Sequence, residues 1–138
     1  MPKRDVYHDQ VRNALIKEGW IITHDPLTIQ VGKRYVHIDL GAESVIAAEK
    51  ANLKIAVEIK SFVGKSDVDD LEKAVGQYVV YRTHLKNSDP DRKLYLAVPS
   101  EAYTKLFEEP IGEAVVQTEN LCLLIFKEGE EQILKWIN

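Results

Sequence analysis

Three consecutive segments in the middle of the chain constrain the fold most strongly. Residues 54–60 (KIAVEIK) form a short apolar and β-branched run, residues 66–86 show helical periodicity, and residues 93–98 form a second apolar run that ends before Pro99. A strand, a long helix and another strand in succession favour parallel pairing of the two strands, because the helix supplies the right-handed crossover that such pairing requires. The sequence therefore predicts an α/β fold with residues 54–60 in the centre of a sheet.

The long helix has a clear start and one apolar face. Ser66 and Asp69 have the spacing of a capping box, in which the serine side chain accepts a hydrogen bond from a backbone N–H of the first turn. Side chains at three- and four-residue spacing predict the face that packs on the sheet. These are Val68, Leu71, Ala74, Val75, Tyr78, Arg82 and Leu85.

The flanking segments predict additional helices and strands. A first helix is expected from a cap at Asp5 to about Glu18, with Gly19 ending it. Short β-rich runs separated by turn residues predict antiparallel strands. Turns at 50–53 and at 128–130 predict two hairpins. The expected strands are 20–23, 28–31, 35–38, 45–48 (joined to 54–60 by a turn at 50–53), 121–126 and 131–137, and weaker helical pieces are 100–107 and 111–117.

Length and charge limit the class of protein. At 138 residues the chain fits one domain, so we treat residues 1–138 as a single unit. No apolar run approaches the roughly 20 residues that cross a bilayer, and the start lacks the apolar stretch of a signal peptide, so we expect a cytoplasmic protein that does not bind membranes. The net charge of -4 means that any binding of nucleic acid must use a local basic patch or a partner. Basic residues gather at 33–34, 50–54, 60–65 and 92–93, a pattern also typical of solvated surface.

Acidic and basic side chains around the central strand suggest a metal and phosphate site. Alternation along a strand places Glu58 and Lys60 on one face. Asp39 follows the expected strand 35–38, with eighteen residues between it and Glu58, and can approach the same end of the sheet. Two carboxylates and the backbone carbonyl of Ile59 would form the hard oxygen site that Mg²⁺ or Mn²⁺ prefers, and Lys60 would position the attacking water.

Each of these residues also has an ordinary structural interpretation. Acid–lysine pairs two apart are common on solvated strands, and Asp39 fits a turn residue that accepts backbone hydrogen bonds before Gly41. Gln77 and Tyr81 lie four apart on one helix face, where they would either grip a phosphate or base or form a half-buried helix flank. His8 is a further candidate, although a lone histidine is more often a hydrogen-bonded structural group.

The order Asp39, Glu58-Ile-Lys60, Gln77 and Tyr81 resembles that of the restriction-endonuclease-like superfamily of aspartate, glutamate-x-lysine nucleases. More closely, residues 37–43, 46–50, 55–62 and 76–81 resemble the cyanobacterial XisH-like family of fdxN element excision controlling factors. The resemblance implies a restriction-endonuclease-like core, with a central mixed sheet flanked by helices. It also implies metal and catalytic roles for Asp39, Glu58 and Lys60, with Gln77 and Tyr81 in support.

The same resemblance implies a role in site-specific DNA rearrangement, together with a separate recombinase and a small XisI-like companion protein. The chain departs from the superfamily pattern at two points. Ile38 stands where a proline often precedes the first acid, and the first-helix glutamate is replaced by His8 or displaced to Asp9.

Three functions therefore remain open at this stage. The chain is a Mg²⁺-dependent endodeoxyribonuclease, or a non-catalytic factor of the same fold that directs a recombinase, or an unrelated α/β domain with an accidental motif. The last alternative predicts that Asp39 and Glu58 lie far apart in space. The sequence also leaves open whether the chain associates with a second copy of itself.

Overall fold

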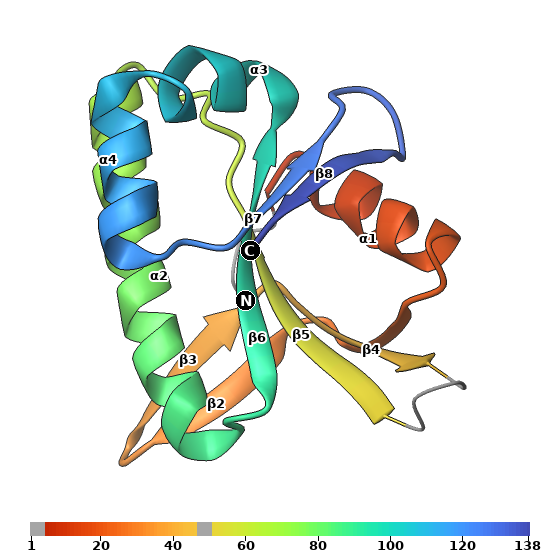
Figure 1. Cartoon of the computed structure of the whole chain (residues 1–138). Helices are drawn as coiled ribbons and strands as arrows, with labels where there is room; N and C mark the ends of the chain where they lie inside the picture. Colours follow the sequence, from red (N-terminus) through yellow and green to blue (C-terminus); the bar gives the residue numbers. More distant parts are fainter. Residues whose placement is uncertain (1–4, 47–50) are drawn as a thin grey trace.

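The computed structural model describes residues 5–46 and 51–138, which form a mixed sheet covered by helices on both sides (Figure 1). The main sheet has six strands in the order β1-β4-β5-β6-β7-β8, and β2 pairs with β3 in a separate two-stranded ribbon. The elements are α1 (His8–Lys17), β1 (Ile21–His24), β2 (Leu27–Val31), β3 (Arg34–Ile38), β4 (Leu40–Ile46), β5 (Ala51–Ile59), α2 (Asp67–Ser88), β6 (Arg92–Pro99), α3 (Ser100–Ala102), η1 (Tyr103–Phe107), α4 (Pro110–Glu119), β7 (Leu123–Phe126) and β8 (Ile133–Ile137).

The parallel strand–helix–strand unit predicted from the sequence is confirmed. β5 pairs in parallel with β6 through the α2 crossover, and β6 pairs in parallel with β7. β4 and β5 form an antiparallel hairpin, as do β7 and β8, and β2 pairs antiparallel with β3. The sheet is therefore mixed, with β5 and β6 in its centre.

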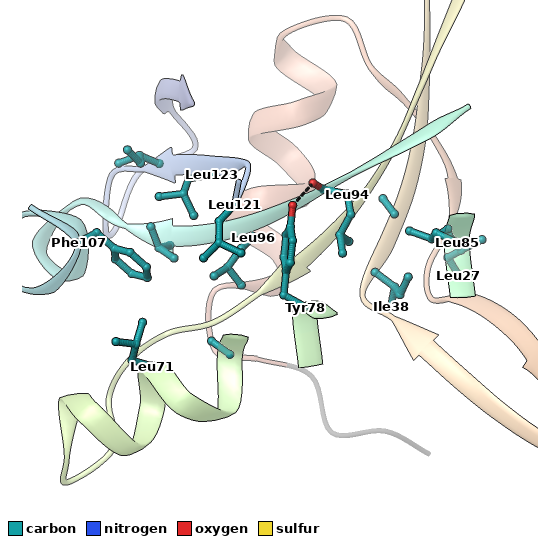
Figure 2. Close-up of a cluster of buried hydrophobic side chains, with 14 of the residues drawn as sticks. Leu27, Ile38, Leu71, Tyr78, Leu85, Leu94, Leu96, Phe107, Leu121 and Leu123 are labelled. Atoms are coloured by element: carbon teal, nitrogen blue, oxygen red, sulfur yellow. Dashed lines mark hydrogen bonds between the residues drawn. The ribbon is translucent and has the colours of Figure 1, made fainter. Parts of the chain in front are cut away.

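Each face of the sheet covers its own apolar core. On one face, Ala56, Leu94 and Leu96 pack with side chains of α2, and Figure 2 shows Tyr78 of α2 reaching the Leu94 carbonyl oxygen at 3.1 Å. On the other face, Ile55, Val57 and Ile59 pack with Val11 and Leu15 of α1. The alternation predicted for the central strand is thus confirmed, since its odd-numbered side chains share one face and Ala56 lies on the other.

The capped start of α2 is also confirmed, with one correction to its inner face. The Ser66 hydroxyl accepts a hydrogen bond from the Asp69 backbone N–H at 3.2 Å. Leu71, Ala74, Tyr78 and Leu85 are buried, but Val68 is 45 % exposed because it belongs to the first turn, which the sheet does not cover.

Several expected boundaries were wrong. Asp5 does not cap α1, whose N-cap is Tyr7; the Asp5 carboxylate instead accepts hydrogen bonds from the backbone N–H groups of Tyr7 and Ser61. β1 pairs antiparallel with β4, as an antiparallel strand was predicted there without a stated partner. β5 begins at Ala51, inside the expected turn 50–53, and β4 begins at Leu40, well before the expected strand 45–48.

Residues 47–50, which include the end of the expected strand 45–48, the start of the turn and most of the family-like segment 46–50, lie outside the described residues. The expected helical piece 100–107 divides into α3 and the π-helical turn η1. Within the described part of the chain, no helix combines the length and apolar character needed to cross a membrane.

Candidate functional site

The two acids predicted to meet, Asp39 and Glu58, are in direct contact. β4 and β5 pair with Leu40 opposite Val57, so Asp39, just before β4, lies opposite Glu58 near the carboxyl end of β5. The Asp39 backbone N–H donates to Glu58 Oε1 at 3.2 Å, and Asp39 Oδ2 accepts from the Ile59 N–H at 2.8 Å. This contact excludes an accidental motif in which the two acids lie far apart. Asp39 also accepts a backbone hydrogen bond, as expected if it has a purely structural role.

Burial makes the carboxylate pair hard to ionise fully. Glu58 is only 6 % exposed. Burial raises the pKa of Glu58 to about 9, and the neighbouring Asp39 carboxylate adds to that shift. Burial also raises the pKa of Asp39, against the opposing effect of the Ile59 N–H hydrogen bond. Two interacting acids titrate as a unit, so the pair retains a proton at neutral pH when nothing else neutralises it.

Lys60 lies beside the pair at the end of β5. Its backbone N–H donates to the Ala97 carbonyl oxygen of β6 at 3.0 Å, which fixes the end of the strand. Its ammonium charge lowers the pKa of Glu58, opposing the larger effect of burial. Lys60 also lines a surface hollow of about 210 Å³ together with Asp5, Ser61, Asp70 and Lys73, among others. The acids and the lysine of the predicted site are therefore gathered at one end of the sheet.

Tyr81 of α2 faces the same acids. Burial raises the pKa of Tyr81 to about 12, and the charges of Glu58 and Asp39 contribute to the increase. Gln77 lies one turn earlier on the same helix. Its side-chain oxygen is buried and has no hydrogen-bond partner among residues 5–46 and 51–138. The structure thus places Tyr81 near the carboxylates and leaves Gln77 with an unused buried acceptor.

His8 occupies the first turn of α1 and is paired with an acid that the sequence did not single out. His8 is 3 % exposed, and its Nε2 lies 2.7 Å from Asp25 Oδ1. Asp25 also binds Arg12 Nε at 3.2 Å. A positive charge on His8 would lower the pKa of Asp39, so the histidine lies within electrostatic range of the site. His8 is therefore a hydrogen-bonded group next to the acids, consistent with its structural interpretation.

Sequence reasoning missed Asp5 and Asp25. Asp5 was assigned to a helix cap, yet Asp5 Oδ2 accepts from the Ser61 N–H at 3.0 Å, directly after Lys60. Its charge also raises the pKa of Asp39, although other effects are larger. No local pattern connects residues so distant in sequence, so only the fold could identify these two acids.

The oxygen donors of Asp39 and Glu58 suit a hard divalent cation, although two carboxylates are few ligands. Asp39 and Glu58 offer carboxylate oxygens, the ligand type that Mg²⁺ and Mn²⁺ prefer, and a cation would offset the cost of burying two acids together. In the described part of the chain, no cluster of three or more histidine, cysteine, aspartate or glutamate side chains is placed to hold a metal. A metal here would need backbone oxygen, such as the predicted Ile59 carbonyl, water or phosphate to complete its ligands.

Comparison with known families identifies the chain. The family model described as XisH protein matches residues 1–134, which include every candidate site residue. The chain belongs to the XisH family. An XisH family protein from Nostoc punctiforme PCC 73102 has a crystal structure that matches with a TM-score of 0.87 at 39 % identity, over 97 % of this chain and 100 % of that one.

A second crystal structure gives the same result for this XisH family member. It is of an fdxN element excision controlling factor protein from Anabaena variabilis, with a TM-score of 0.87 and 39 % identity over 98 % of this chain and 100 % of that one. A search of curated proteins found no match. The near-complete mutual coverage means that the α/β architecture described above is that of the family's solved structures.

Proposed function

We propose that this XisH family member acts on DNA during excision of a chromosomal element, as a metal-dependent phosphodiesterase with a restriction-endonuclease-like core. The excision role is suggested by the related Anabaena variabilis protein, which is named an fdxN element excision controlling factor. The observation that carries the catalytic part is the contact between half-buried Asp39, just before β4, and buried Glu58 of β5, beside Lys60. Buried acids placed together without a cation destabilise a fold, so their presence favours a functional reason.

In this proposal, Asp39 and Glu58 hold Mg²⁺ or Mn²⁺ with the Ile59 carbonyl. When bound, the metal would polarise a phosphate oxygen and lower the pKa of a bound water. Lys60 orients the attacking water, and Gln77 and Tyr81 contact the phosphate or a base. Water adds to phosphorus, the bond from phosphorus to the leaving deoxyribose oxygen breaks, and that oxygen takes up a proton. Burial shields the Glu58 carboxylate from bulk water.

A second candidate function is a non-catalytic DNA-rearrangement factor that assembles with an XisI-like companion and directs a recombinase. Two observations favour it. The chain carries a net charge of -4, which suits a protein partner better than nucleic acid alone. The first-helix glutamate of many related nucleases is replaced by His8, whose Nε2 lies 2.7 Å from Asp25 Oδ1, or is displaced to Asp9.

Metal titration combined with a nicking assay distinguishes the two functions. Mn²⁺ and Mg²⁺ are titrated calorimetrically into the parent protein and its Asp39→Asn and Glu58→Gln variants, and each protein is incubated with supercoiled DNA and metal. The control is Glu72→Gln, which removes one exposed acid of α2 that is not among the groups shifting the pKa of Asp39 or Glu58. We expect metal binding and nicking in the parent and the control, and loss of both in the two site variants.

A folded parent that binds neither metal would contradict the catalytic proposal. The companion-directed function would then be the better description, because the fold and the family assignment would be unaffected. Nicking that persists in both site variants would point to a contaminating nuclease and would equally reject the assigned site.

A further inference from the structure

Acidic residues are unevenly distributed along this chain. The two longest stretches without aspartate or glutamate are residues 26–38 and 73–88. The first contains β2 and β3, and the second contains most of α2. Leu27 and Ile29 of β2 belong to the same buried cluster as Leu85 of α2. The fold therefore joins the two acid-free stretches into one locally basic region of a chain whose net charge is -4.

The β2–β3 ribbon has one buried and one exposed face. Leu27, Ile29 and Ile38 are buried and attach the ribbon to α2. On the other face, Thr28 pairs with His37 and Gln30 pairs with Tyr35, and all four side chains are exposed. Tyr35 is 59 % exposed. This outer face presents hydrogen-bonding groups and an aromatic ring, with no negative charge.

Two basic side chains lie at the turn of the ribbon. Lys33 and Arg34 are exposed and follow Gly32, whose φ of 60° suits the turn. Within the described residues, neither side chain forms an ion pair. The acidic residue that lines the pocket beside β2 is Asp89, and its carboxylate is already bound by Lys54 at 2.6 Å and by Arg92 at 3.0 Å. The positive charge of the turn is therefore available to a ligand.

We propose that the β2–β3 ribbon docks on duplex DNA, with Lys33 and Arg34 on phosphates and the outer face of Gln30, Tyr35 and His37 against a groove. The inference deepens the proposed function, on which it rests, by naming the surface that holds the substrate. A major groove about 12 Å wide admits a two-stranded ribbon. β3 has five residues, spans about 17 Å and leads directly to Asp39, so the turn and the acids are about half a helical turn of DNA apart.

The test measures binding of a fluorescent DNA duplex of mixed sequence at several NaCl concentrations in EDTA, so that no cleavage occurs. The ribbon variant is Lys33→Ala with Arg34→Ala. The control is Lys105→Ala with Lys127→Ala, which removes the same charge from η1 and from the segment after β7, at the α3 end of the molecule and away from the ribbon (Figure 1). All four lysine and arginine side chains are exposed, so both variants should fold.

We expect the ribbon variant to bind about tenfold more weakly, and its plot of log K against log salt to lose about one unit of slope per residue removed. The control should retain the affinity and slope of the parent. Unchanged binding by the ribbon variant, an equal loss in the control, no binding by the parent, or a preference for single-stranded DNA or RNA would each overturn the proposal.

This experiment and the nicking assay fail independently. If no DNA is nicked but the ribbon variant loses duplex binding, the docking surface is supported and the catalytic proposal is rejected. If the parent nicks DNA and the ribbon variant binds like the parent, the catalytic site is supported and the ribbon is rejected as the docking surface.

Discussion

At the scale of single residues, the contact between Asp39 and Glu58 is the feature that needs a functional reason. Glu58 accepts a hydrogen bond from the Asp39 backbone, and both acids have a raised pKa because they are buried. Lys60 lowers the pKa of Glu58 but does not outweigh burial. A metal-free protein with this pair is therefore less stable than the same fold with a neutral group in its place.

We predict that Glu58→Gln stabilises the metal-free protein. With the pKa of Glu58 at about 9 in the folded state and near 4.5 in the unfolded state, folding at pH 7 requires uptake of a proton. Glutamine removes that requirement, so the free energy of unfolding should rise by about 2 kcal/mol and Tm by about 5 °C in EDTA. Calorimetry at pH 7 measures the change.

The stabilisation expected from Glu58→Gln should depend on pH. The penalty is absent below the unfolded pKa, because both states are then protonated, and it grows as pH rises above that value. The difference between Glu58→Gln and the parent should therefore vanish near pH 4. The control Glu72→Gln, at an exposed position of α2, should leave Tm unchanged at both pH values. A lower Tm for Glu58→Gln at pH 7 would show that Glu58 is ionised and stabilised in the metal-free fold.

At the scale of elements, α2 connects the apolar core with the candidate site. Its inner face buries Tyr78, whose hydroxyl donates to the Leu94 carbonyl oxygen and accepts from the Cys122 N–H. The next turn carries Tyr81 toward the carboxylates. The position of α2 along the sheet is thus set by packing, and the position of Tyr81 follows from it.

We predict that Ser66→Ala lowers stability by about 1 kcal/mol, because it removes the side-chain acceptor for the Asp69 N–H at the start of α2. Urea unfolding followed by circular dichroism measures this loss. Ser88→Ala is the matched control at the other end of the helix, where the hydroxyl donates to the His84 carbonyl oxygen without capping a free N–H. Equal losses in the two variants would show that the Ser66 cap contributes nothing specific.

At the scale of the whole molecule, Asp89 connects the end of α2 with two central strands. Its carboxylate binds Lys54 of β5 at 2.6 Å and Arg92 of β6 at 3.0 Å. Arg92 is largely buried and also donates to the Ile55 carbonyl oxygen at 2.9 Å. Burial alone would raise the pKa of Asp89, but the hydrogen bonds from Lys54 and Arg92 hold it below its usual value.

We predict that Asp89→Asn destabilises the protein at pH 7 by about 1 to 3 kcal/mol, because the buried Arg92 loses its nearer charged partner and keeps the more distant Glu43 at 3.9 Å. A lowered pKa contributes stability above the unfolded value of 3.8, and that stability is lost as pH falls through the folded value. The difference from the parent should therefore shrink below about pH 4. Chemical unfolding at pH 7 and pH 3 tests this, with exposed Asp91→Asn as the control. A loss that does not change with pH would contradict the ionic explanation.

Local patterns were sufficient for most of the elements and for part of the site, although they misplaced β4 and the N-cap of α1. Alternation in residues 54–60 correctly placed the apolar side chains of β5, and helical spacing with Ser66 correctly placed α2. The motif spacing also brought Asp39 and Glu58 together correctly, because β3, β4 and β5 follow each other closely along the chain. Information of this kind is local: it depends on neighbours within a strand, a turn or a helix.

Contacts between residues far apart in the sequence depend on tertiary packing. The pairing of β1 with β4, the Asp5 contact with Ser61 and the pairing of His8 with Asp25 depend on how whole elements pack, and no spacing within one element encodes them. Packing also brings residues 26–38 and 73–88 together into one acid-free region. Sequence patterns predicted most of the strands and helices and the acids at the end of β5, but not the bounds of β4 or the N-cap of α1. The packing of α1, α2 and the ribbon on the sheet determined the surroundings of those acids, because burial and charge at a site come from every element that covers it.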